Sequence, residues 1–211
     1  MIHAKNISRT YHVGEIEIRA LKDASADIEA GEYVAIIGKS GAGKSTFLYQ
    51  LGLLDYPTTG SLVVDGVDVL KLSNNKRTKF RLRELGYVFQ NYALLPELSA
   101  EENVMLPLVM DERSFDEARV LAQEVLARLG LKDRFKSVPS QLSGGEQQRV
   151  SVARAIAHKP KILFADEPTA NLDSETSSVL LDYLEELNHN GQTIVMVTHE
   201  LDYAKRAGRI I

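Results

Sequence analysis

Residues 38–46 read Gly38-Lys39-Ser40-Gly41-Ala42-Gly43-Lys44-Ser45-Thr46. The run follows a short apolar segment, residues 33–37, and precedes a helical pattern over residues 47–54. A strand, a glycine-rich loop and a helix that begins with Lys-Ser-Thr are typical of a P-loop. Glycines let successive backbone N–H groups point inward at phosphate oxygens, and the positive end of the helix dipole strengthens the attraction. The run therefore predicts a nucleotide-phosphate site.

The last residues of the loop have expected tasks. Lys44 is predicted to reach the β- and γ-phosphates, and the Ser45 hydroxyl is predicted to bind Mg²⁺. A dinucleotide-binding loop fits less well, because it would have glycine where Thr46 stands. The predicted phosphate-binding residues are Gly38, Lys39, Ser40, Gly41, Ala42, Gly43, Lys44, Ser45 and Thr46.

The composition is that of a globular domain, with 44% hydrophobic and 26% charged residues among 211. A net charge of −4 argues against a general affinity for nucleic acid, so no nucleic-acid partner is expected. Cysteine is absent, which excludes disulfides and fits a reducing cytosol. The start of the chain does not read as a signal peptide, and no apolar run approaches the ~20 residues of a membrane span. We expect a cytoplasmic protein that acts at a membrane through a partner.

The pattern of elements predicts an α/β fold with a helical insertion. The first third is β-rich, and the expected strands cover residues 2–10, 16–21, 25–28 and 61–64. Helical character dominates residues 91–141, where capping boxes begin at Ser99 and Ser114. Farther on, expected helices over residues 146–158 and 174–188 each precede an apolar strand, at 162–165 and 193–197. Fully apolar strands that alternate with helices indicate a parallel sheet covered on both faces.

A second glycine-containing segment has two interpretations. It reads Leu142-Ser143-Gly144-Gly145-Glu146-Gln147-Gln148. Ser143 and Glu146 have the spacing of a capping box, which leaves the two glycines unexplained. Each glycine destabilises a helix by about 1 kcal/mol relative to alanine. Paired glycines suit a place where another group must approach the backbone, and an anion is the natural candidate.

Paired carboxylates follow the apolar strand at Asp166-Glu167-Pro168. Neighbouring side chains on an extended chain point to opposite sides, so the two acids are expected to serve different tasks. Pro168 disfavours helical geometry at Glu167, and we therefore expect extended backbone there. A solvated acidic turn is the alternative interpretation.

Together these motifs resemble the ATPase subunits of ABC transporters. Residues 38–46 match the Walker A motif, 142–148 the LSGGEQQ signature, 162–167 the Walker B motif, and His199 the switch histidine. The motifs span nearly the whole chain in the family's order. The resemblance implies a RecA-like P-loop NTPase core with a parallel sheet and an N-terminal antiparallel β subdomain.

The implied organisation is a single domain over residues 1–211. In it the core and β subdomain cover residues 1–90 and 142–211, and an inserted helical subdomain covers residues 91–141.

The resemblance also implies ATP hydrolysis with Mg²⁺ and assigns the site residues. The implied metal ligands are Ser45, Gln90 and Asp166, and the implied catalytic residues are Glu167 as general base, His199, Gln90 and Lys44. Tyr11 is implied to stack on adenine, and Asp173 to cross a dimer interface. The ATP bound by the partner copy is implied to meet Ser143, Gly144, Gly145 and Glu146. We expect His3, His12, His158 and His189 to be ordinary surface residues.

The implied partners are a second copy of the chain, bound head to tail with ATP between the copies, and an integral membrane permease. Residues 102–108 and 169–174 look like the macrolide-exporter, lipoprotein-release and cell-division ATPases, which work on the inner face of the cell membrane. The apolar residues 92–95 either dock the permease or pack inside the helical lobe. A soluble ATP-gated clamp on nucleic acid or ribosomes is the alternative function. It would need a long coiled coil or a second ATPase unit, and the sequence has neither.

Overall fold

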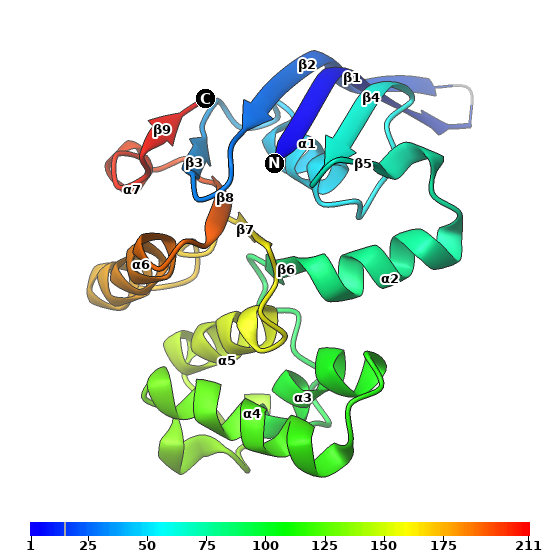
Figure 1. The fold of residues 1–211 in the computed structure, drawn as a ribbon. Helices are drawn as coiled ribbons and strands as arrows, with labels where there is room; N and C mark the ends of the chain where they lie inside the picture. The colour runs from blue at the N-terminus through cyan, green and yellow to red at the C-terminus, as the bar shows by residue number, and fades with distance from the viewer. Residues whose placement is uncertain (15) are drawn as a thin grey trace.

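The computed structural model describes residues 1–14 and 16–211, which form two sheets and a helical lobe (Figure 1). The strands are β1 (Ile2–Val13), β2 (Ile16–Ile28), β3 (Tyr33–Ile36), β4 (Thr59–Val64), β5 (Val67–Asp68), β6 (Leu85–Val88), β7 (Ile162–Asp166), β8 (Thr193–Val197) and β9 (Arg209–Ile210). The helices are α1 (Lys44–Leu51), α2 (Asn74–Glu84), α3 (Ala100–Met110), α4 (Phe115–Arg128), α5 (Gly144–Ile156), α6 (Ser174–His189) and α7 (Leu201–Ala204). Short 3₁₀ turns are η1 (Val69–Lys71), η2 (Lys132–Arg134) and η3 (Pro139–Gln141).

The parallel sheet is the centre of the molecule, as the apolar strands predicted. Its order is β6-β7-β8-β3-β9, and every neighbouring pair is parallel. Side chains alternate along β3: Val34 and Ile36 pack into the core beside α1, whereas Tyr33 and Ala35 pack into the core beside α5 and α6. Both faces of the sheet are therefore buried, and its carboxyl edge is left for the loops that carry the site.

The antiparallel sheet, in the order β2-β1-β4-β5, covers the α1 side of the core. We expected two separate strands at 16–21 and 25–28, and this was wrong, because β2 runs unbroken from Ile16 to Ile28. Its pairing with β1 changes register, and Asp23 has a φ of 48°. Such an irregularity interrupts the alternation of apolar residues, which explains why the sequence pattern showed two pieces.

The helical lobe is built from α3 and α4, and α5 packs against both. The two capping boxes that the sequence predicted, at Ser99 and Ser114, are present. Helix α5 also packs against β6, so it joins the lobe to the parallel sheet. The subdomain boundaries at residues 90 and 142 stay a prediction. No helix within residues 1–14 and 16–211 combines the length and the apolar character that a membrane span requires.

Candidate functional site

The glycine-rich loop lies between β3 and α1, at the carboxyl edge of the parallel sheet (Figure 1). Gly43 is the N-cap of α1 with a φ of 90°, a left-handed conformation that favours glycine. A Cβ at this position would come within 2.4 Å of the Ala20 carbonyl oxygen on β2. Glycine is therefore needed at position 43 both for its conformation and for the close passage of β2.

Lys44 begins α1 and folds back over the loop. Its Nζ donates to the carbonyl oxygens of Gly38, at 3.0 Å, and of Lys39, at 3.3 Å. The ammonium group thus lies over the concave side of the loop, where the sequence predicted phosphate oxygens. Its assigned task stays a prediction, and its placement suits that task.

A hydroxyl–carboxylate pair joins the loop to the end of β7. Ser45 Oγ donates to Asp166 Oδ1 at 2.8 Å, although the two residues lie 121 positions apart. Tyr49, one turn farther along α1, donates to Asp166 Oδ2 at 2.7 Å. Burial, with the hydrogen bond to Asp166 as a second cause, raises the pKa of Tyr49 to about 12, so this hydroxyl stays a donor. Tyr49 was not predicted from the sequence, although its i+4 spacing from Ser45 could have identified it.

These oxygen atoms suit Mg²⁺. The ion prefers oxygen ligands and is typically held by one or two carboxylates together with substrate phosphates and waters. The Ser45 hydroxyl and the buried Asp166 carboxylate provide such donors beside the glycine-rich loop. In the part of the chain that the structure describes, no group of three or more His, Cys, Asp or Glu side chains could hold a metal. Ser45 and Asp166 alone would leave further positions on such an ion to phosphate oxygens and waters.

The second acid faces a histidine. His199 Nδ1 lies 2.7 Å from Glu167 Oε2, and the His199 ring also approaches Glu200 at 3.3 Å. We expected extended backbone at Glu167, and this was wrong, because its φ is 48°. The Glu167 N–H still donates to Val197 O, after which the chain turns and Ala170 N donates back to Glu167 O. This turn aims the Glu167 carboxylate at the loop after β8.

Gln90 follows β6, and its backbone is tied to the segment before α6. Asn171 Nδ2 donates to the Gln90 carbonyl oxygen at 2.9 Å. Arg154 of α5 donates to the next carbonyls, at 2.9 Å to Tyr92 and 2.6 Å to Ala93. Burial lowers the pKa of Arg154, whose guanidinium is nevertheless the anchor of this loop. The contact of Gln90 with a metal stays a prediction.

Asp173 and Tyr11 already have partners within this chain. Asp173 is the N-cap of α6 and accepts from Thr176 N at 2.8 Å, which lowers the pKa of its carboxyl. Tyr11 donates from its hydroxyl to Asp55 at 2.7 Å, and the Arg9 guanidinium lies 4.4 Å from its ring centroid. One face of the Tyr11 ring is thus covered by Arg9, and adenine stacking stays a prediction for the ring.

The signature segment, residues 142–148, forms the N-terminus of α5. Ser143 Oγ accepts from Glu146 N at 3.2 Å, and Glu146 Oε2 accepts from Ser143 N at 2.8 Å, so the capping box is real. The Ser143 side chain also hydrogen-bonds the Glu146 carboxylate, so this serine has a partner within its own chain. Among the described residues, no hydrogen bond or ion pair joins this segment to residues 38–46.

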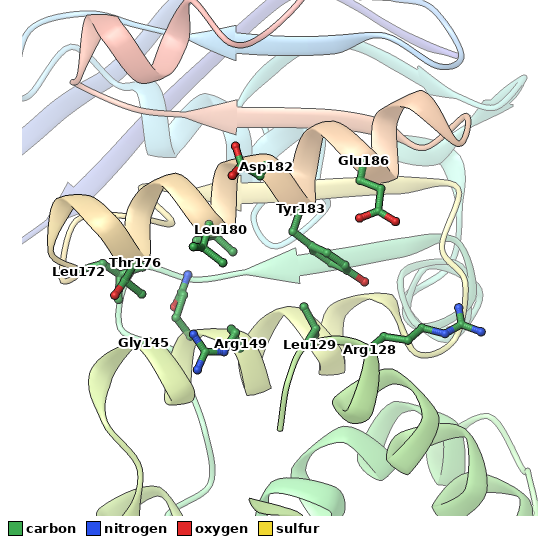
Figure 2. A pocket seen from close by; sticks show the side chains of 12 residues that line it. Arg128, Leu129, Gly145, Arg149, Leu172, Thr176, Leu180, Asp182, Tyr183 and Glu186 are labelled. Carbon is green, nitrogen blue, oxygen red and sulfur yellow. The ribbon is translucent and has the colours of Figure 1, made fainter. Parts of the chain in front are cut away.

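The structure supplies a second reason for the paired glycines. A Cβ on Gly145 would lie 2.6 Å from Thr176 Cγ2, and a Cβ on Gly144 would lie 3.0 Å from the Tyr92 hydroxyl. Figure 2 shows Thr176 of α6 over Gly145 of α5, at one end of a cavity of about 250 Å³ between the two helices. The groups that approach these glycines in one chain are therefore its own side chains. Approach of an anion stays a prediction.

A groove of about 330 Å³ lies between the core and the helical lobe. Its lining includes Tyr87, Phe89 and Ala93 from the β6 side and Pro107 and Met110 from α3. The lining also includes His158, which we expected on the surface; this was wrong, because His158 is half-buried beside the Leu85 carbonyl and burial lowers its pKa. Leu95, two residues after the groove residue Ala93, is 46% exposed, whereas Leu94 packs on the core. Leu94 thus follows the packing alternative, and docking of the permease on this segment stays a prediction.

This chain is similar to known proteins over its full length. A family model described as ABC transporter matches residues 21–170. The lipoprotein-releasing system ATP-binding protein LolD of Bordetella avium is 46% identical over 209 residues, which cover 99% of this chain and 91% of that protein. The macrolide export ATP-binding/permease protein MacB of Hyphomonas neptunium is 46% identical over 211 residues, covering 100% of this chain and 33% of that protein.

The chain is also similar in structure to a solved ATP-binding cassette. The dimeric ATP-binding cassette MJ0796, in a post-hydrolysis state bound to ADP and Pi, superposes with a TM-score of 0.93 at 44% identity. The match covers 100% of this chain and 93% of that one. The aligned stretches include the glycine-rich loop, the signature segment and the paired acids.

Proposed function

Since this chain belongs to the ABC transporter family, as a subunit that binds and hydrolyses ATP to power a membrane permease complex, we propose that two copies work as a head-to-tail dimer. Each ATP lies between residues 38–46 of one copy and residues 142–148 of the other. The permease serves export, lipoprotein release or mechanical transmission, and it holds the dimer on the inner face of the cell membrane. The likeness to LolD, to MacB and to a dimeric cassette supports this proposal.

The observation that carries the proposal is a convergence at one edge of the parallel sheet. Lys44 and Ser45 follow β3, Asp166 ends β7, Glu167 comes directly after it, and His199 follows β8. These strands are neighbours in the sheet, and their carboxyl ends lie side by side. A cation, a metal-binding oxygen pair and a carboxylate–histidine pair thus surround one small volume, which suits phosphoryl transfer to water.

Within this volume Lys44 and the loop N–H groups hold the phosphates. Lys44 exchanges its bonds to the loop carbonyls for bonds to phosphate oxygens. Ser45, Asp166 and Gln90 are the residues that would hold Mg²⁺. When bound, the ion neutralises charge on the phosphates.

Glu167 is proposed as the general base that accepts a proton from the attacking water. His199 holds the Glu167 carboxylate from one side and lies where it can donate to the terminal phosphate. The left-handed backbone of Glu167 is a strained conformation for a residue that is not glycine, and such strain is common where a side chain must be aimed.

The signature segment completes the site from the other copy. The Ser143 hydroxyl and the N-terminus of α5 are proposed to meet the phosphates of the partner's ATP. The permease is proposed to dock in the groove between the core and the lobe, where Met110 is exposed beside an apolar lining, and on the exposed Leu95, two residues after Ala93 of that lining.

A mixing experiment tests the head-to-tail arrangement. Lys44→Ala disables the phosphate loop, and Ser143→Asp keeps a good helix cap while placing a negative charge against the phosphate. Each variant alone is expected to hydrolyse ATP poorly. In a mixed dimer, the intact loop of one copy meets the intact signature of the other.

An equal mixture should therefore recover roughly a quarter of the parent's rate, because half of the dimers are mixed and each has one intact site. A mixture as inactive as its components would contradict a site built from the loop of one copy and the signature segment of the other. Each variant mixed with itself is the control.

A further inference from the structure

The loop that leads to the signature segment is fastened to the N-terminus of α3. Ala100 N donates to Ser137 O at 2.8 Å, and Glu101 N donates to Phe135 O at 3.0 Å. The first N–H groups of a helix have no partner within the helix, so these two bonds satisfy donors that α3 would otherwise leave open. Residues 134–137 thus lie directly on the end of α3.

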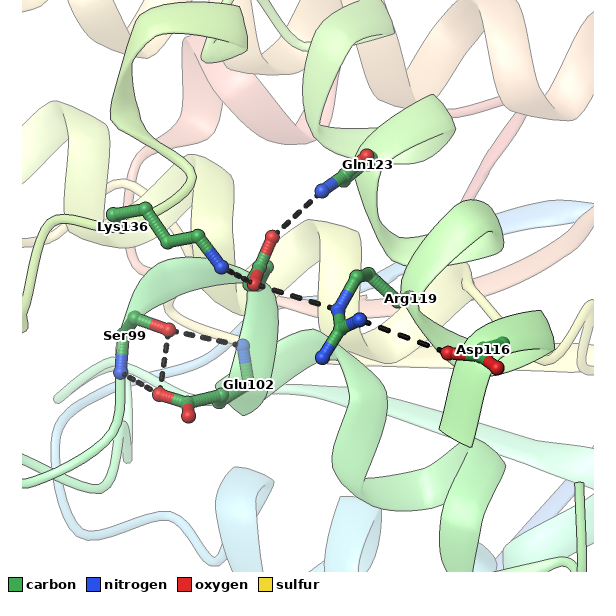
Figure 3. Close-up of polar contacts among 7 residues, drawn as sticks. Ser99, Glu102, Asp116, Arg119, Gln123 and Lys136 are labelled. Atoms are coloured by element: carbon green, nitrogen blue, oxygen red, sulfur yellow. Dashed lines mark hydrogen bonds and ion pairs between the residues drawn. The ribbon is translucent and has the colours of Figure 1, made fainter. Parts of the chain in front are cut away.

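A buried carboxylate holds the same loop from inside. Glu101 is 2% exposed, accepts from Gln123 Nε2 at 2.8 Å, forms an ion pair with Lys136 and lies 3.9 Å from Arg119 Nε. Figure 3 shows Lys136, Gln123 and Arg119 converging on this turn of α3, next to the Ser99–Glu102 capping box. A carboxylate at this depth needs such partners, because an unpaired buried charge is strongly unfavourable. The loop, α3 and α4 are therefore joined at Glu101.

The opposite side of the loop reaches the signature segment. Arg134 Nε donates to Glu146 Oε1 at 2.7 Å. The other oxygen of the same carboxylate accepts from Ser143 N at 2.8 Å. Arg134 and the Ser143 backbone together hold the pKa of Glu146 at about 2, so the carboxylate is ionised in both contacts. Arg134 thus fixes Glu146, and Glu146 fixes Ser143.

The N-terminal end of α3 is also fixed to the segment that precedes it in the chain. Asn103, which is fully buried, accepts from Leu95 N at 2.8 Å and donates to the carbonyl oxygens of Leu95 and Leu98. The first turns of α3 therefore connect the segment that contains the exposed Leu95 to the loop that carries Arg134.

We propose that Arg134 is a positioning residue for the signature serine, mounted on a loop that Glu101 anchors. Arg134 lies outside residues 142–148 and touches neither loop 38–46 nor the paired acids, so no motif assigns it a role. It acts through Glu146, which holds Ser143 in the capped conformation at the N-terminus of α5. The inference rests on the proposed dimer, in which Ser143 meets the partner's nucleotide.

The test measures ATP-induced dimerisation in a Glu167→Gln protein, which is expected to bind ATP and to hydrolyse it about 10²- to 10⁴-fold more slowly. Adding Arg134→Gln should raise the dimer dissociation constant about fourfold to tenfold, because each dimer contains two such ion pairs and a half-exposed pair contributes about twofold to threefold. The affinity of the monomer for ATP should stay unchanged, since loop 38–46 is untouched. Arg134→Lys keeps the charge and should recover at least half of the loss.

Arg83→Gln is the matched control. Arg83 pairs with Asp111 at 2.6 Å with similar exposure, at the far end of α3. Adding Arg83→Gln to the Glu167→Gln protein should leave the dimer dissociation constant unchanged. Equal dimerisation in the Arg134→Gln and Arg83→Gln proteins would overturn the inference.

A lower melting temperature that Arg134→Lys does not correct would assign Arg134 to folding of the lobe alone, and this too would overturn it. If the Glu167→Gln protein itself stays monomeric with ATP, the proposed dimer fails, and the inference fails with it.

Discussion

Glu167 and His199 form a direct side-chain contact, Oε2 to Nδ1 at 2.7 Å, across the ends of two neighbouring strands. The contact is made because the backbone at Glu167 turns into a left-handed conformation instead of continuing β7. His199 thus holds one oxygen of the Glu167 carboxylate.

Glu167→Gln should slow ATP hydrolysis about 10²- to 10⁴-fold, the usual effect of losing a general base. The amide keeps the size of the side chain and a hydrogen bond to His199, so ATP binding should persist. Size-exclusion chromatography should then show a dimer that appears only with ATP. Turnover at the parent's rate in this variant would remove Glu167 from the role of base.

Lys44→Ala should weaken ATP binding itself. The Nζ atom spans the loop between two carbonyl oxygens and lies where phosphate charge is expected. Loss of a charged hydrogen bond typically costs about 1.5–3 kcal/mol, or roughly tenfold to a hundredfold in affinity. Calorimetry with ATP at fixed Mg²⁺ measures the change. A dissociation constant equal to that of the parent would contradict the assignment of this loop.

Gly145→Ala should destabilise the contact between α5 and α6. The new methyl would meet Thr176 Cγ2 at 2.6 Å, and overpacking of this kind typically costs about 1–3 kcal/mol. Thermal unfolding measures the loss. Thr176→Ser removes that methyl and keeps the hydroxyl that bonds Asp173, so the double variant should recover most of the melting temperature. No recovery in the double variant would show that another contact limits position 145.

Leu95→Glu should reduce co-purification of the permease while the protein stays folded. Leu95 is 46% exposed, so a charge there disturbs docking without entering the core. Leu94 would be a poor choice, because it packs on the core and a charge there would unfold the lobe. Leu201→Glu, at 53% exposure on α7, is the matched control. Intact co-purification with Leu95→Glu would exclude this segment from the docking surface.

The Glu146 carboxyl should make stability depend on pH. Its pKa falls from 4.5 to about 2 on folding, so its contribution is present above pH 4.5 and is lost as the pH falls toward 2. Arg134 is half exposed, and solvent screening limits the contribution to on the order of 1 kcal/mol. Glu146→Gln should therefore melt below the parent at pH 6, and the difference should shrink by pH 3.5. A difference that is constant with pH would contradict this origin.

The sequence predicted the parts of the site that local patterns encode. Residues 38–46 and 142–148 were recognised because their glycines stand next to charged or hydroxyl side chains. Asp166 and Glu167 were recognised because they follow an apolar strand. Helix α2 was not foreseen, since only Arg77 is buried in it and it has no apolar stripe. Arg154 was missed for another reason, because its partners Tyr92 and Ala93 lie about 60 positions away. Pairings at such a distance depend on tertiary structure, which no local pattern contains.

The close passage at Gly43 has a mechanical consequence. The Ala20 carbonyl of β2 rests against the backbone where α1 begins, with no room for even a methyl group between them. An added side chain at position 43 would therefore push β2 away from the start of α1. Because β1, which carries Tyr11, is paired with β2 along most of its length, such a shift would also move Tyr11 relative to the glycine-rich loop.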